Sequence, residues 1–196
     1  MAVRTSQARR VPVTRRVALA VAFIALGVAL GAFSFPIGPA RVAPFQHMIN
    51  VLIGVMIGPL DATLVAFAIA LVRNAVGTGT VLAFPGSIFG ALFVGLVYRY
   101  LWRSDHAVWV EIIGTTVIGA TVGYLMLAGV SQPQAALGFI PVRPLRAFTF
   151  DAFGLAITLP PGLWALWAAF AVSDIPGCIL GFLVLKSLRR AGLVTT

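Results

Sequence analysis

Long apolar runs, separated by proline, glycine and charged residues, dominate the sequence. Each run is about as long as the roughly 20 residues that span a bilayer, which predicts membrane helices. The second run is short and begins with polar residues, so we expect its start below the membrane surface or covered by other helices. The predicted helices lie at 17–35, 45–57, 61–75, 87–101, 108–130 and 162–185.

Helix-breaking residues occupy the connections. Gly58 and Pro59 end the second helix, and Asp61 is expected to cap the third by accepting from free backbone N–H groups. The longest connection, 131–161, is moderately apolar and rich in proline, and a partly inserted segment is expected near 148–159.

Composition supports an all-α integral membrane protein. The 196 residues are 60% hydrophobic and only 10% charged, with a mean hydropathy of +1.03, whereas soluble domains carry roughly 25% charged residues. The expected organisation is a basic arm at 1–16, one six-helix membrane domain at 17–190 and a tail at 191–196. We interpret 17–35 as a membrane helix and not a signal peptide, because its apolar run exceeds the usual length of about 7–15 residues.

The net charge of +9 comes mainly from residues at the ends of apolar runs, which favours a membrane surface over nucleic acid as the reason for the charge. The positive-inside rule then predicts that both termini are cytoplasmic. The predicted cytoplasmic basic residues are Arg4, Arg9, Arg10, Arg15, Arg16, Arg99, Arg103, Lys186, Arg189 and Arg190; the predicted outer ones are Arg41, Arg73, Arg143 and Arg146.

Two groups of polar side chains lie at predicted membrane depth. Their helical spacing places Gln46, His47 and Asn50 on one face, and Arg73, Asn74 and Gly77 repeat that spacing. Polar groups at this depth are costly, so a shared ligand pocket is the main hypothesis. A hydrogen-bonded clasp that only holds the helices together is the alternative.

The loop between the third and fourth helices adds backbone groups that a small molecule can approach. Gly77, Gly79, Pro85 and Ser87 are the expected contributors, and Phe84 either stacks on a flat heterocycle or packs in the core. No GxxxxGK[ST] pattern is present, so a nucleotide phosphate cradle is not expected.

Asp174 lies near the middle of the last predicted helix and needs a partner. Arg73 is expected at a comparable depth, so we predict an Arg73–Asp174 pair. Glu111 falls in the first turn of its predicted helix, where the helix dipole favours an acid. Catalytic motifs such as HExxH and GxSxG are absent, and the sequence predicts no catalytic residues, metal site or cofactor.

Small residues recur four apart on the first helix, which allows another helix to approach closely. Ala18 with Ala22, and Ala25 with Ala29, form such ridges, as do Gly27 and Gly31. Contact with another protein and packing within the chain's own bundle both remain open at this point.

The segments FPIGPARVAPFQHMINVLIGVMIGP, at 35–59, and RNAVGTGTVLAFPGSIFGAL, at 73–92, closely resemble the ThiW family. The resemblance covers roughly 17–100. It implies a six-helix S component of an energy-coupling factor (ECF) transporter, which binds a thiazole precursor of thiamine at outer loops and helix ends in a prokaryotic plasma membrane. It also implies a transmembrane coupling subunit and two cytoplasmic ATPases as partners, with docking through Ala18, Ala22, Ala25 and Ala29.

The first hypothesis is therefore a binding subunit without enzymatic activity, for hydroxyethylthiazole or a close relative. A solitary channel or proton-coupled carrier using His47, Arg73 and Asp174 is the second, and a membrane enzyme the third. The predicted substrate-binding residues are Gln46, His47, Asn50, Arg73, Asn74, Gly77, Gly79, Phe84, Pro85, Ser87 and Asp174.

Overall fold

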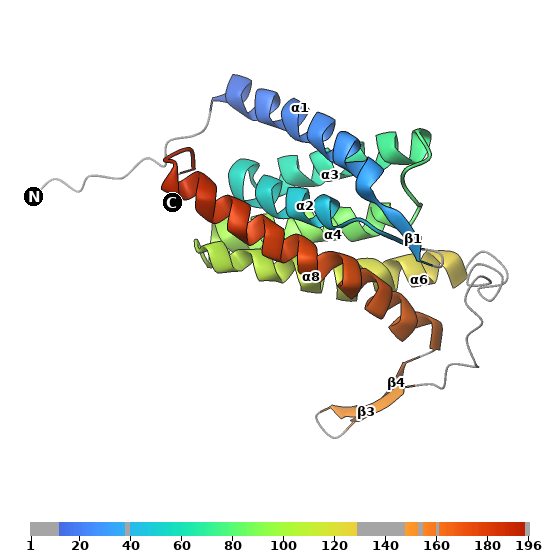
Figure 1. The fold of residues 1–196 in the computed structure, drawn as a ribbon. Coiled ribbons are helices and arrows are strands. Elements are labelled where there is room, and N and C mark those ends of the chain that lie inside the picture. Colours follow the sequence, from blue (N-terminus) through green and yellow to red (C-terminus); the bar gives the residue numbers. More distant parts are fainter. Residues whose placement is uncertain (1–11, 38–39, 129–147, 153–154, 160, 195–196) are drawn as a thin grey trace, which may run out of the picture.

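The computed structural model describes residues 12–37, 40–128, 148–152, 155–159 and 161–194, and helices dominate this part of the chain (Figure 1). The first half contains α1 (Val13–Leu30), β1 (Phe35–Ile37), β2 (Ala40–Val42), α2 (Pro44–Ile57), α3 (Pro59–Ala75) and α4 (Ala83–Leu96). A π-helical turn, Val97–Leu101, extends α4.

A second long helical rod runs from Asp105 to Ala128. It consists of a 3₁₀ turn (Asp105–Trp109), α5 (Val110–Ile112), a π-helical stretch (Ile113–Gly119) and α6 (Ala120–Ala128). The strands β3 (Phe148–Ala152) and β4 (Leu155–Leu159) form an antiparallel hairpin, and α8 (Pro161–Arg190) follows.

The structure confirms an all-α membrane protein. In the described part of the chain, four helical segments are long and apolar enough to cross a membrane: Val13–Phe33, Ala83–Leu101, Asp105–Leu127 and Gly162–Arg190. The helix α2 is shorter, about 21 Å at 1.5 Å per residue. Most of its residues are buried, because α1, α3, α4 and α8 surround it. The core is therefore built around α2, as expected for a short helix covered by others.

The two ends of the bundle differ in character. At one end, which we call the hairpin end, lie the β1–β2 hairpin and the loop at 76–82, joined where Ser34 Oγ donates to the Thr78 carbonyl oxygen at 3.3 Å (Figure 1). The opposite end, the basic end, contains the start of α1 and the end of α8. There Arg189 Nε donates to Asp105 Oδ1 at 2.5 Å.

Glycines allow the helices to pack closely. A Cβ placed on Gly114 would lie 2.7 Å from the Phe89 carbonyl oxygen, and one on Gly119 would lie 2.7 Å from Gly86 Cα. The backbones of α4 and the 105–128 rod are thus nearly in contact, the kind of interface that small residues permit in membranes.

The helix α1 lies on the outside of the bundle and has two different faces. Gly27 packs against Ile69 of α3, where a Cβ would approach the isoleucine to 2.6 Å. The alanine ridges, formed by Ala18, Ala22, Ala25 and Ala29, are exposed on the opposite side of the helix. Of the small-residue ridges on α1, only the one formed by Gly27 and Gly31 therefore packs within the bundle.

Several expected local features differ from the structure. Asp61 caps no helix: its carboxylate accepts from the Arg16 guanidinium and ties α3 to α1. The fourth helix begins at Ala83 and not at 87, because Pro85 fits a first turn in which no helical N–H is needed. The segment 148–159 contains a β hairpin, and the expected connection at 131–147 lies outside the described residues.

Candidate functional site

A cavity of about 40 Å³ lies at the hairpin end, where β2, α2, the 76–82 loop, α4 and α8 converge. It has room for about three water molecules. Both polar and apolar side chains line it. The lining residues are Arg41, Ala43, Gln46, His47, Arg73, Gly79, Thr80, Leu82, Ala83, Gly86, Ser87, Ala169, Phe170 and Ser173.

One wall of the cavity is a hydrogen-bonded chain across three helices. The Arg73 guanidinium of α3 donates to Gln46 Oε1 of α2, and Gln46 Nε2 donates to Ser87 Oγ of α4 at 2.9 Å. All three residues are buried. The two polar faces predicted from sequence spacing, one on α2 and one on α3, therefore do meet.

The loop at 76–82 is held in place by the end of α3. Arg73 Nη2 donates to the Thr78 carbonyl oxygen at 2.9 Å, and Asn74 Nδ2 donates to the Thr80 carbonyl oxygen at 3.0 Å. Gly77 has a φ of +78°, a left-handed conformation that a side chain would strain. These contacts hold Gly79 and Thr80 in the lining of the cavity. Asn74 and Gly77 determine the conformation of the loop but do not line the cavity.

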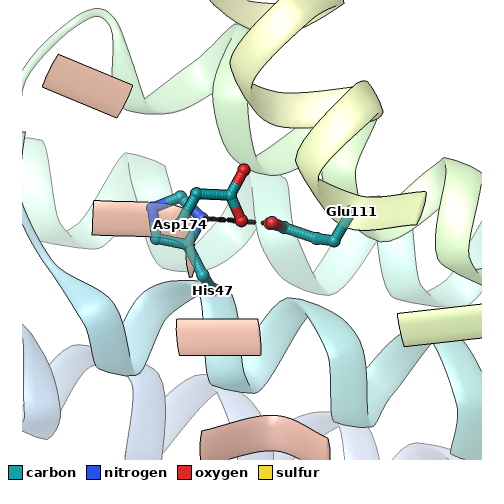
Figure 2. A group of neighbouring side chains, drawn as sticks. All are labelled: His47, Glu111 and Asp174. Atoms are coloured by element: carbon teal, nitrogen blue, oxygen red, sulfur yellow. Dashed lines mark hydrogen bonds and ion pairs between the residues drawn. The ribbon is translucent and has the colours of Figure 1, made fainter. Parts of the chain in front are cut away.

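A buried cluster of His47, Glu111 and Asp174 lies beneath the cavity. Figure 2 shows the three side chains converging from α2, α5 and α8. His47 Nδ1 lies 3.0 Å from Glu111 Oε1 and 3.8 Å from Asp174 Oδ1. Both carboxylates have no exposed surface, and the imidazole reaches the cavity lining from above them.

Further donors complete the hydrogen bonding of the carboxylates. Asn50 Nδ2 and Thr115 Oγ1 donate to Glu111 Oε1 at 3.0 and 2.8 Å. Thr116 Oγ1 donates to Asp174 Oδ2 at 2.9 Å, and Cys178 Sγ lies 3.3 Å from Asp174 Oδ1. Polar residues from α2, the 105–128 rod and α8 thus form one network inside the bundle.

This network fixes the orientation of the His47 ring. When Glu111 is ionised, the proton of the neutral imidazole lies on Nδ1, where the carboxylate accepts it. Nε2 then carries a lone pair and has no hydrogen-bond partner among the described residues, while His47 lines the cavity. The floor of the cavity therefore presents a hydrogen-bond acceptor.

The same cluster contains donor atoms suitable for a metal ion. One atom each from His47, Glu111 and Asp174 lies within 4.8 Å of the others. A histidine with two carboxylates is a donor set that transition metals accept. The internal hydrogen bonds described above already account for these groups without an ion.

The structure separates the sequence-predicted site residues into two sets. Those that line the cavity are Gln46, His47, Arg73, Gly79 and Ser87. Those that do not are Asn50, Asn74, Gly77, Phe84, Pro85 and Asp174. Asn50 and Asp174 support the floor from below, whereas Phe84 packs on Phe67 with ring centroids 5.5 Å apart and Pro85 is buried in the first turn of α4.

The predicted Arg73–Asp174 ion pair is wrong. Arg73 donates hydrogen bonds to Gln46 and to the Thr78 carbonyl oxygen. Asp174 accepts one from Thr116 and lies beside His47. Similar depth does not bring two side chains together, because the helices also present them in different directions around the bundle.

Sequence reasoning missed several residues of the site. The sequence predicts Glu111 only as an acid that the helix dipole favours. Thr115 and Thr116 follow it in the same apolar run and indicate a polar face. Ser173, next to Asp174, accepts from the Ala43 N–H at 2.7 Å and closes the cavity between β2 and α8. Arg41 and Phe170 gave no periodic signal, since one lies in a hairpin and the other in an apolar helix.

Comparison with known proteins adds a family to this geometry. The family model described as thiamine-precursor transporter protein (ThiW) matches residues 17–157, which is more than half of the chain. No curated protein and no solved structure gave a match. The chain therefore belongs to the ThiW family of thiamine-precursor transporter proteins, and it is a multi-pass membrane transporter component and not an enzyme.

Proposed function

We propose that this chain is the substrate-binding S component of an ECF importer and that its cavity captures hydroxyethylthiazole. The observation that carries the proposal is a cavity at one end of the bundle, lined by both polar and apolar groups, with an apolar core beyond its floor. Ile49, Ile53 and Val94 are fully buried in that core. Because the core closes the cavity on the side away from the hairpin end, a bound ligand cannot pass through the protein. This suits a protein that captures a ligand and needs partner subunits to release it.

The chemistry of the cavity suits a small heterocycle with a hydroxyl group. Phe170 and Leu82 offer apolar contact for a flat ring, and His47 Nε2 can accept a hydrogen bond from the ligand hydroxyl. Gln46 and Ser87 supply further polar atoms nearby. Room for about three waters in 40 Å³ means that the ligand displaces water and moves side chains on entry.

The distribution of basic residues supports a cavity that faces outward. Arg16, Arg99 and Arg189 lie at the basic end, and the positive-inside rule assigns such an end to the cytoplasm. The hairpin end and its cavity then face the exterior of a prokaryotic plasma membrane. A ligand can reach the site from that side.

The exposed alanine ridges of α1 support docking on a transmembrane coupling subunit, which two cytoplasmic ATPases would drive. Ala18, Ala22, Ala25 and Ala29 leave a smooth strip on which another helix can pack at close range. Because Gly27 and Gly31 already hold α1 against α3, the alanine strip is free for a partner.

The direct test measures binding and complex formation. Purified protein in nanodiscs is titrated with hydroxyethylthiazole, with the pyrimidine precursor of thiamine and with intact thiamine, and its copurification with coupling and ATPase subunits is examined. We expect thiazole binding and copurification. Failure to bind any of the three compounds would remove the proposed substrate, and absence of the ATPase subunits would remove the ECF assignment.

Replacing Ala22 with leucine is expected to impair transport without affecting ligand binding. The larger side chain fills the exposed strip and keeps a partner helix at a distance, while the cavity lies elsewhere. Uptake and copurification should fall at least tenfold, with the affinity of the isolated protein unchanged. The control is Val17→Leu, an exposed position about a quarter turn around α1 from the alanine strip; an equal effect of both variants would argue against docking there.

A second candidate function is a proton-coupled carrier that works alone. The buried His47, Glu111 and Asp174 cluster favours it, because such groups act as proton relays in transporters. Uptake that survives deletion of the ATPase subunits and follows the proton gradient would support this candidate over the first.

A further inference from the structure

Among the side chains that the structure describes, two cationic ones and no acidic one line the cavity. Arg41 of β2 and Arg73 of α3 both line it, and no aspartate or glutamate is among the lining residues. The carboxylates nearest to it, Glu111 and Asp174, lie below the imidazole of His47. The described lining of the cavity thus carries a positive charge that no lining carboxylate compensates.

Arg73 is the more deeply buried of the two, with 2% of its surface exposed. Its Nη atoms donate to Gln46 Oε1 and to the Thr78 carbonyl oxygen, both of which are neutral acceptors. Its Nε lies against Gly31 of the α1 end and has no acceptor. Burying a guanidinium at membrane depth is costly unless an anion accompanies it.

Arg41 is also without an anionic partner in the described structure. Its guanidinium donates to Ser34 Oγ at 3.2 Å and to the Ser34 carbonyl oxygen at 2.9 Å. It is near enough to Arg73 for the two charges to repel each other. An anion between them would remove this repulsion. It would also accept hydrogen bonds from the guanidinium N–H groups that the neutral acceptors do not use.

The four carboxylates whose side chains the structure describes are all engaged elsewhere. Asp61 pairs with Arg16 and Asp105 with Arg189 at the basic end. Glu111 and Asp174 share His47 and accept from their own hydroxyl, amide and thiol donors. Among these four carboxylates, none supplies the anion that Arg41 and Arg73 require, and the side chain of Asp151 in β3 lies outside the part that the structure describes.

We propose that the transported precursor itself carries this anion, an oxyanion in the form of a carboxylate or a phosphate monoester, bound between Arg41 and Arg73. Guanidinium groups bind both oxyanions through paired N–H donors, with more geometric specificity than a point charge. Phe170 and Leu82 then contact the heterocycle. The inference rests on the proposed function and refines its ligand to an acidic thiazole.

The test compares the affinity of the purified protein for three ligands: hydroxyethylthiazole, its phosphate monoester and a hydroxyethylthiazole carboxylate. At least one acidic form is expected to bind at least tenfold more tightly than the neutral compound, and the better of the two identifies the oxyanion. The preference should weaken at high salt. Arg41→Gln should reduce the preference at least tenfold, and R41K should retain part of it.

Arg73→Gln is expected to remove the preference too, but its burial makes misfolding a risk, so the half-buried Arg41 carries the test. The matched control is Arg99→Gln, an exposed arginine at the basic end, which should leave all affinities unchanged. Equal or tighter binding of the neutral thiazole would overturn the inference and leave the proposed function standing. Absence of binding by every thiazole would overturn both.

Discussion

Replacing Glu111 with alanine is expected to destabilise the protein strongly and to abolish ligand binding. The carboxylate is fully buried and accepts from His47 Nδ1 and Asn50 Nδ2, both at 3.0 Å. Without it these two buried donors lose their acceptor, at a cost of about 1–3 kcal/mol each. Thr115 keeps its second acceptor, the Gly86 carbonyl oxygen at 2.9 Å, so its contribution is smaller.

Thermal unfolding in nanodiscs and ligand titration measure the two effects. Glu111→Gln is the informative control, because it keeps the shape of the side chain and one carbonyl oxygen. We expect it to fold with a much smaller loss of stability. Its amide can donate to Nδ1 and place the imidazole proton on Nε2, so binding should still weaken at least tenfold. Wild-type stability and affinity in the alanine variant would contradict this account of the cavity floor.

The pattern of apolar runs predicted the helices well, because each connection contains residues that helices tolerate poorly. The burial of α2 was also predictable: a short run with a polar start cannot face lipid along its whole length. Its start at Pro44 places His47 in the first turn, directly under the hairpin end. Residue spacing alone was therefore sufficient to predict that Gln46 and His47 belong to one site.

Contacts between distant helices were less predictable. Depth along a helix follows from counting residues, but the direction of a side chain around the bundle depends on packing, which spacing does not give. Asp174 therefore lies beside His47 and not beside Arg73. Glu111 does lie in the first turn of α5, as expected, but the 3₁₀ turn Asp105–Trp109 precedes α5, so the rod begins before the expected 108.

Substituting Gly177 with valine is expected to separate α8 from α2 and to weaken ligand binding. A Cβ at this position would lie 2.4 Å from the Pro44 carbonyl oxygen and 2.5 Å from His47 Cβ. Backbone atoms cannot move away as a flexible side chain can, so the helices must shift, at a cost of about 1–3 kcal/mol for overpacking. Because α8 also carries Phe170 and Ser173 of the cavity lining, the shift opens that wall and pulls Asp174 away from His47.

The matched control is Ala168→Val, an exposed position on the same helix where the added methyl groups meet lipid. It should leave the unfolding temperature and the affinity near those of the wild type, since no neighbouring backbone has to move. Parallel thermal unfolding and ligand titration of both variants separate a steric effect at the α2–α8 contact from a general effect of valine on helix stability. Equal behaviour of the two variants would show that this close contact does not determine the position of the cavity wall.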